Sequence, residues 1–231
     1  MADAATPASP VSAPRPTGID VASWTSRRAW AWLLGSTAVS LAIDLWTKAA
    51  AFARVADAPV DVVRERVVEM QNSGRSLQSL IPPHEPVRAL GDWLHLTLVL
   101  NPGAVFGIGA GKRWFFVVFT LIAVAFGVYL FKTWTRARDT MAHVALGLVL
   151  AGGLGNLYDR LVFACVRDFL HPVPLMKMPL GLKWPGGNDE LWPYVSNVAD
   201  LWLIVGVGLL LIFSFRGHAE PKEPAKADAA G

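Results

Sequence analysis

The sequence predicts an α-helical integral membrane protein with four transmembrane helices and a small extracytoplasmic β-sheet on the outer membrane surface. Three observations support this fold class. Apolar residues make up 53% of the 231 residues and charged residues only 17%, which is little charge for a soluble domain. Four apolar runs each approach the roughly 20 residues that a helix needs to cross the hydrocarbon core. One further stretch places leucine at every second position, as a strand does.

Composition also narrows the class of function. The formal net charge is +3, but the basic residues are scattered and form no stripe interleaved with aromatic residues, so we expect no nucleic-acid partner. Cys165 is the only cysteine, which excludes an intrachain disulfide and a zinc site built from several thiolates. We expect neither a metal ion nor another cofactor.

The two ends of the chain differ from its middle. Residues 1–22 are rich in Ala, Pro and Ser, and residues 216–231 mix Lys, Glu, Pro and Ala. Neither end has an apolar periodicity that could offset the entropy lost on ordering, so both are predicted to be disordered tails. Residues 23–215 then form one membrane domain.

The four predicted spans place both termini on one side of the membrane. Their approximate limits are 29–52, 114–131, 141–162 and 198–215. Basic residues that flank the spans or join the second to the third mark the cytoplasmic side by the positive-inside rule: Arg27, Arg28, Lys132, Arg136, Arg138 and Arg216. A twin-arginine leader is the alternative at the N-terminus, but its apolar run would be too long and contains Asp44 and Lys48.

Two outer segments, 53–113 and 163–197, connect the spans. In the first, Trp93 to Leu100 alternates leucines on one face with Trp93, His95, Thr97 and Val99 on the other, which predicts a strand ended by Asn101-Pro102-Gly103. The polar stretch 56–86 receives no assignment.

Ionisable residues inside a span are candidates for function, because each costs roughly 3 kcal/mol on insertion scales unless a partner compensates it. Asp44 and Lys48 are four residues apart on one helical face in the favourable acid-first order. They form either a structural ion pair or a pair that orients another strand or the substrate backbone near an active site.

Two further clusters contain side-chain amides. Asn101 begins a turn of small residues, and the local chemistry alone supports no more than a turn there. In the third span, Gly152 permits close helix packing, while Asn156 and Arg160 share a face at the outer end of the helix. The alternative to a functional role for this helix end is a structural one, in which the glycines allow helix packing and Asp159 and Arg160 form an interfacial anchor.

The last two clusters each contain an acid beside a helix end. Asp168 follows the third span. The alternative to a functional role is that it is a surface carboxylate paired with Arg167 or Arg160. Asp200 lies at the start of the fourth span, where Asn197 and Asp200 together resemble a capping box.

Topology connects these two acids. The third and fourth spans are joined on the outside, so Asp168 and Asp200 can converge at one aqueous boundary. Two neighbouring carboxylates share a proton near neutral pH, which makes one an acid and the other a base. Such a pair can activate water for peptide hydrolysis. A thiol dyad of Cys165 and His171 is the weaker alternative.

The order of these motifs resembles lipoprotein signal peptidase, over about residues 29–215. The matching motifs are Asp44…Lys48, Asn101-Pro102-Gly103-Ala104, Gly152…Asn156…Asp159-Arg160, Val166-Arg167-Asp168-Phe169 and Asn197-Val198-Ala199-Asp200. Each motif is weak alone, but five in the right order with four spans are highly specific.

The resemblance implies a bacterial inner-membrane aspartyl endopeptidase that cleaves prolipoproteins just before a diacylglyceryl-modified cysteine. Carried over by position, Asp168 and Asp200 would be catalytic. The residues that support them or bind substrate would be Asn156, Arg160, Asn197, Asn101, Gly152, Asp44 and Lys48. The resemblance also implies inhibition by cyclic peptide antibiotics that sit between the aspartates. We expect a monomer in contact with membrane lipids, with its active site at the periplasmic face.

Two outer stretches, 54–90 and 171–194, are longer than the family pattern. The second contains five prolines with Trp184, Trp192 and Tyr194, and we interpret it as an interfacial lid with tryptophans at headgroup depth. Two other classes of function remain as alternatives. A proton-coupled transporter would use the acids as a relay, but no inverted repeat is visible. A noncatalytic scaffold would explain the glycines but not the convergent polar residues.

Overall fold

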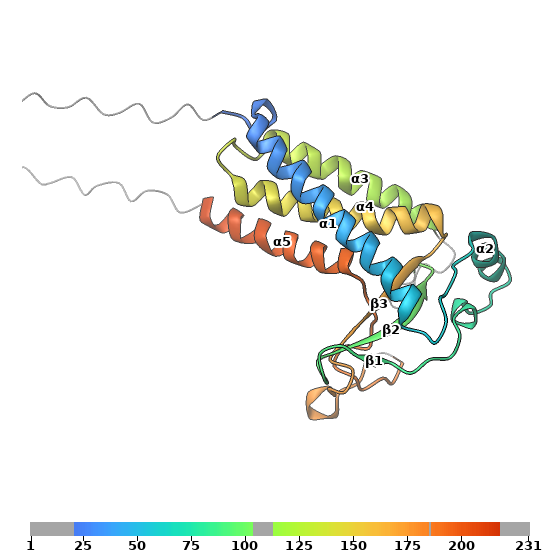
Figure 1. Ribbon diagram of the computed structural model, residues 1–231. Coiled ribbons are helices and arrows are strands. Elements are labelled where there is room, and N and C mark those ends of the chain that lie inside the picture. The colour runs from blue at the N-terminus through green and yellow to red at the C-terminus, as the bar shows by residue number, and fades with distance from the viewer. Residues whose placement is uncertain (1–20, 104–112, 185, 218–231) are drawn as a thin grey trace, which may run out of the picture.

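Four long helices form a bundle, and a small sheet lies at one end of it (Figure 1). The computed structural model describes residues 21–103, 113–184 and 186–217. The long helices are α1 (Arg27–Arg54), α3 (Arg113–Thr133), α4 (Thr140–Val162) and α5 (Val198–Gly217). Each is long and apolar enough to span a membrane, which confirms the predicted fold class. The predicted tails fall mostly on residues 1–20 and 218–231, outside the described residues.

Helix α4 is the centre of the bundle and packs against α1, α3 and α5. It is largely buried inside the protein, whereas α1, α3 and α5 direct most of their apolar side chains outward. An outward apolar surface on three helices is what a bundle surrounded by lipid requires. Glycines allow the close approach of α4 to α5, because a Cβ on Gly152 would collide with the carbonyl oxygen of Ala199.

The short segment before α1 is attached to the link between α3 and α4. Ser23 is fully buried, and its hydroxyl lies 2.7 Å from Thr135 Oγ1 and 2.9 Å from Nε2 of His143. Ala22 bridges to Arg136. Ser26 then accepts a hydrogen bond from the N–H of Ala29 and caps α1.

The sheet contains three antiparallel strands in the order β1-β2-β3. They are β1 (Val87–Arg88), β2 (Leu94–Asn101) and β3 (Val166–Pro172). The register of β2 on β3 places Val99 opposite Asp168. Buried Leu98 and Leu100 pack with the end of α1 and with Phe169 in one apolar cluster, so the sheet is fixed to the outer end of the bundle.

The predicted strand is present, but its strict alternation is wrong. The pairing of β2 with β3 shifts register between Leu96 and Val99, and such a bulge moves the residues on its two sides onto opposite faces. Leu94 consequently faces the same pocket as Asn101, whereas Leu98 and Leu100 face the core. The prediction had placed Leu94 on the face of Leu98 and Leu100.

The unassigned stretch 56–86 contains a helix, α2 (Arg64–Asn72), and a 3₁₀ turn, η2 (Leu77–Leu80). Only Val67 and Met70 of α2 are buried, and both belong to the apolar cluster beneath the sheet. A helix with two core residues in nine carries too little periodicity to be recognised from sequence.

The two ends of the bundle are chemically different. The start of α1 and the end of α5 lie together at one end, and the sheet with α2 lies at the other (Figure 1). The outer ends of α4 and α1 and the start of α5 therefore meet the sheet, which brings the predicted polar clusters into one region.

Candidate active site

Asp168 and Asp200 are brought together by a short contact between β3 and the start of α5. Leu170 pairs with Ser196 through backbone hydrogen bonds of 2.8 Å in both directions, Ser196 N–H to Leu170 O and Leu170 N–H to Ser196 O. Asp168 lies two residues before this bridge and Asp200 four residues after it. The long stretch 171–195 leaves and returns through the same point, so its length does not separate the two acids.

Asn197 lies between the two carboxylates and is almost fully buried. Its side-chain Nδ2 donates to Oδ1 of Asp168 at 2.6 Å, and its backbone N–H donates to Oδ2 of Asp200 at 3.2 Å. The N–H of Asp200 donates back to Oδ1 of Asn197. This reciprocal pair is the capping box that the sequence suggested. Asp200 therefore caps α5 and lies beside Asp168 at the same time.

Two more amides complete the hydrogen bonding of the carboxylates. Nδ2 of Asn101 donates to Oδ2 of Asp168 at 3.0 Å, and Nδ2 of Asn156 donates to Oδ1 of Asp200 at 2.8 Å. Oδ1 of Asn101 accepts from the N–H of Gly103 and Oδ1 of Asn156 accepts from Nδ2 of Asn197. Each of the four carboxylate oxygens thus accepts one hydrogen bond from an oriented N–H.

Beneath the acids, Asp44 and Lys48 form a fully buried ion pair with an Nζ–Oδ2 distance of 2.9 Å. Nζ of Lys48 also donates to Oδ1 of Asn156 at 3.0 Å, and Oδ1 of Asp44 accepts from the N–H of Ala199 at 2.8 Å. The pair is therefore both a structural ion pair and an orienting one, since it fixes an amide on α4 and the first turn of α5.

A second buried pair joins this group and was not predicted. Asp159 accepts from the backbone N–H of Arg167 at 2.9 Å and from its Nη2 at 2.9 Å, and lies 3.6 Å from Nζ of Lys48. The interpretation of Asp159 with Arg160 as an interfacial anchor is wrong, because Asp159 is fully buried and faces Arg167. The spacing of Asn156 and Asp159 on one helical face is the signal that could have identified it.

Asp168 is likewise not a surface carboxylate paired with an arginine. It is almost fully buried, and Arg167 is turned to the opposite side of β3, where successive side chains alternate. The Arg167 guanidinium lies 4.1 Å from the ring of Phe163. Burial, and next the negative charge of Asp200, raise the pKa of Asp168 to about 7, against the opposing hydrogen bonds from Asn197 and Asn101.

Of the remaining predicted site residues, Arg160 borders the pocket and Gly152 lies behind it. Arg160 lies at the pocket, with its guanidinium 5.0 Å above the ring of Phe116 and its Nη1 bonded to the backbone oxygen of Asn156. Its buried Nε has no hydrogen-bond partner among the described residues. Gly152 lies behind the site, where it lets α4 approach the carbonyl of Ala199.

A pocket of about 520 Å³ opens over the two acids. Its polar floor contains Asn101, Asn156, Arg160, Asp168, Asn197 and Asp200. Its walls are mostly apolar and come from the sheet, α5 and the 171–195 stretch: Leu94, Val166, Leu170, Pro172, Trp192, Tyr194, Val195, Leu201 and Ile204. An apolar groove with two neighbouring carboxyls at its floor, one buried and one partly buried, suits general acid–base hydrolysis of a chain that carries apolar groups.

The structure gives no support to a thiol dyad. Cys165 is buried, and burial with the charge of Asp159 raises the pKa of its thiol to about 12, which leaves almost no thiolate at neutral pH. His171 instead lies 3.5 Å from Oε2 of Glu190. Ala104 to Gly107 of the predicted turn lie outside the described residues.

Comparisons with known proteins agree with this arrangement. A sequence profile described as Signal peptidase (SPase) II matches residues 36–216. The chain is 38% identical to a lipoprotein signal peptidase of Desulfitobacterium hafniense over 55% of this chain and 73% of that protein. It is 33% identical to one of Anaeromyxobacter sp. (strain Fw109-5) over 87% of this chain and 92% of that protein.

A solved structure shares the fold. It is a bacterial membrane enzyme determined by the in meso method, with a TM-score of 0.54, 22% identity, and coverage of 83% of this chain and 92% of that one. At this identity the likeness supports the arrangement of helices and sheet alone.

Proposed function

The chain belongs to the signal peptidase II family, a family of aspartic peptidases that remove signal peptides from prolipoproteins, and we propose that it does so with water activated by Asp168 and Asp200. The proposal includes cleavage just before a diacylglyceryl-modified cysteine. One observation carries it: two carboxyls on either side of Asn197 lie at the floor of an apolar groove.

The two acids take different roles because they differ in how readily they hold a proton. Burial and the charge of Asp200 raise the pKa of Asp168, so Asp168 holds the shared proton and Asp200 is the base. Asp200 takes a proton from water, the water oxygen attacks the scissile carbonyl carbon, and Asp168 donates its proton to the carbonyl oxygen. When the tetrahedral intermediate collapses, Asp200 gives its proton to the leaving nitrogen and Asp168 recovers one from the hydroxyl.

The amides position these acids for the reaction. Asn197 contacts both carboxyls, and Asn101 and Asn156 each bind one. Because the amides are already hydrogen-bonded to other groups, they hold the carboxyls without reorganising during the reaction. Asp44 and Lys48 act one layer below, as positioning residues for Asn156 and α5.

Arg160 is the residue we assign to the substrate. It faces the groove and has an unused buried N–H among the described residues, and a guanidinium can donate to several backbone carbonyls at once. The apolar walls would take the lipid-modified part of the substrate and membrane lipid. A cyclic peptide antibiotic would occupy the same groove between Asp168 and Asp200.

The proposed location is the bacterial inner membrane, with both termini in the cytoplasm and the active site at the outer face. Basic residues at the start of α1 and in the α3–α4 link lie at the end of the bundle opposite the sheet, which agrees with the positive-inside rule. A single chain contains the whole group of acids and amides, which supports a monomer. Residues 23–215 are proposed as the peptidase domain.

The transporter and scaffold alternatives are less consistent with these observations. The acids gather at one end of the bundle, around a groove, rather than along a path through it. The direct experiment replaces Asp168 or Asp200 by Asn and follows cleavage of a lipidated prolipoprotein. We expect folded, membrane-inserted protein with cleavage reduced at least about a thousandfold, since the acid–base function contributes about that much. Cleavage near the native rate would refute the two-aspartate mechanism.

A further inference from the structure

The described residues between Pro172 and Tyr194, 173–184 and 186–193, form a two-limbed arm beside the bundle. Its limbs are joined by backbone hydrogen bonds, from Leu191 N–H to Met176 O at 2.7 Å and from Met178 N–H to Asp189 O at 2.8 Å. An ion pair of 2.7 Å between Lys177 and Asp189 joins them again. The arm is therefore a defined substructure rather than a loose loop.

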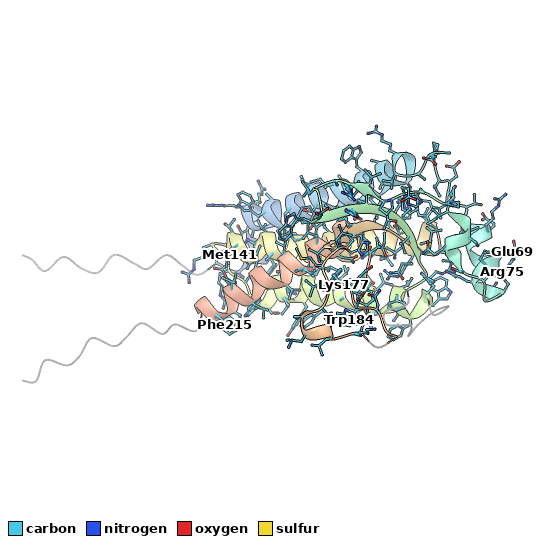
Figure 2. All side chains as sticks on the ribbon, turned by 90° about the horizontal axis from the view of Figure 1, so that it is seen from below. Glu69, Arg75, Met141, Lys177, Trp184 and Phe215 are labelled. Atoms are coloured by element: carbon cyan, nitrogen blue, oxygen red, sulfur yellow. The ribbon has the colours of Figure 1, made fainter. Side chains whose placement is uncertain are left out.

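The arm does not extend beyond the end of the bundle. Its 3₁₀ turn, η3 (Pro179–Gly181), lies level with the first turns of α5, whereas α2 lies beyond the end of the bundle (Figure 1). In Figure 2, Lys177 and Trp184 of the arm lie between Phe215 at one end and Arg75, which follows α2, at the other. The arm thus folds back along the side of the bundle to the level of the first turns of α5.

The first limb exposes apolar side chains at this depth. Leu180 is 96% exposed, and Leu175 and Leu182 are also largely exposed. Leu180 adopts a positive φ of 59°, a backbone conformation that residues other than glycine rarely adopt. Exposed leucines gathered on one short segment are typical of a surface that binds a membrane or another protein.

The surface next to the arm favours a membrane over another protein as the partner of these leucines. The groove over the two acids lies between the arm, through Trp192, and α5, through Leu201 and Ile204. Leu201 and Ile204 are exposed on a helix that is long and apolar enough to span a membrane, so we expect lipid on that side of the groove. The exposed leucines of the arm continue that lipid-facing surface.

We propose that residues 173–183 of the arm insert their leucines into the outer leaflet of the lipid bilayer, so that the groove between the arm and α5 opens sideways into lipid. A substrate held in the membrane by its acyl chains and apolar segment would reach the acids without leaving the lipid. The inference goes beyond the catalytic proposal and does not depend on which residues carry out hydrolysis.

The test places a nitroxide label on the arm. The variant Leu180→Cys, labelled in the full chain, is reconstituted into vesicles of phosphatidylethanolamine and phosphatidylglycerol. The accessibility of the label to oxygen, which partitions into lipid, is compared with its accessibility to a water-soluble nickel chelate. Arg75→Cys, in the loop after α2, is the matched control, since that side chain is exposed beyond the end of the bundle. The native chain treated with the same label measures background labelling, which should be negligible because Cys165 is buried.

We expect the ratio of oxygen to nickel accessibility to be severalfold higher at position 180 than at position 75, with cleavage activity retained. A label at position 180 that meets the nickel chelate as readily as the one at position 75 would overturn the proposal. So would low accessibility to both reagents with spin–spin broadening, which would show that a second copy of the chain covers the arm. Since the measurement needs no turnover, its failure is distinguishable from failure of the two-aspartate mechanism.

Discussion

The ammonium of Lys48 lies 3.0 Å from Oδ1 of Asn156. A cation can only face the oxygen of an amide, so this contact turns the NH₂ group of Asn156 toward Asp200. A residue on α1 that does not line the groove thereby determines which atom of Asn156 faces Asp200, the proposed base.

Lys48→Met should damage both stability and activity. It leaves the buried carboxylates of Asp44 and Asp159 without their shared cation and releases the amide of Asn156. Breaking such a buried pair costs about 3–5 kcal/mol, to be measured by thermal unfolding in detergent. The double variant Asp44→Leu with Lys48→Met should recover part of the stability but not the cleavage rate. Native cleavage by Lys48→Met would show that the amide is held by other contacts.

Asn197→Ser separates capping from catalysis. A serine oxygen can still cap α5, so we expect Asn197→Ser to keep about 1 kcal/mol more of the unfolding free energy than Asn197→Ala does. Serine has no amide to donate to Asp168 and Asn156. Loss of a hydrogen bond to a charged or proton-sharing group, about 1.5–3 kcal/mol, should lower kcat about ten- to a hundredfold. Asn197→Ala, in contrast, should lose both properties, and an equal stability loss in the two variants would contradict the assignment.

Cleavage should be lost as pH rises through about 7. Because the pKa of Asp168 is raised to about 7, its acid form is present below that pH and disappears above it. The rate should then fall about tenfold for each further pH unit. Infrared difference spectra across this range should show a protonated carboxyl that is absent in Asp168→Asn. A rate that stays constant well above neutral pH would assign the proton elsewhere.

Gly152→Ala should weaken the protein more than Gly153→Ala, although the two glycines are neighbours on α4. A Cβ on Gly152 collides with the carbonyl of Ala199 in the first turn of α5, whereas one on Gly153 makes an ordinary contact of 3.5 Å with Thr120. The first substitution should cost about 1–3 kcal/mol by overpacking and reduce cleavage. The second should be neutral or slightly stabilising. Equal effects would show that α5 can shift without harm.

Replacing residues 174–193 by a short turn should raise KM severalfold and leave kcat within about twofold. Trp192 lines the groove, but the bridge of Leu170 with Ser196 holds Asp168 beside Asp200 independently of the arm. The comparison uses steady-state cleavage of prolipoprotein in vesicles. Unchanged kinetics would exclude the interpretation of this stretch as a lid.

Much of the fold could be predicted from the sequence because it depends on local properties. Apolar length defines the four spans, and the shared outer ends of α4 and α5 bring Asp168 and Asp200 to one boundary. Helix α2 could not be predicted, since Val67 and Met70 are its only buried residues. The bulge between Leu96 and Val99 depends on pairing with β3, which the sequence of β2 does not contain.

The contacts of the candidate site likewise fall into local ones, which the sequence predicts, and long-range ones, which it does not. The capping box of Asn197 and Asp200 and the ion pair of Asp44 and Lys48 are contacts between residues three or four apart, so spacing predicts them. The hydrogen bond from Ala199 to Asp44 joins two distant helices. It depends on how closely they pack, and no spacing rule predicts it.

The bridge between Leu170 and Ser196 has a consequence for how this enzyme can diversify. Because the chain leaves and re-enters through the backbone contacts of Leu170 with Ser196, the placement of Asp168 beside Asp200 does not depend on the length of the segment between them. Selection can therefore act on substrate entry and on hydrolysis separately. The same point is a natural site for engineering, where a graft could change which lipidated proteins are accepted while the chemistry stays constant.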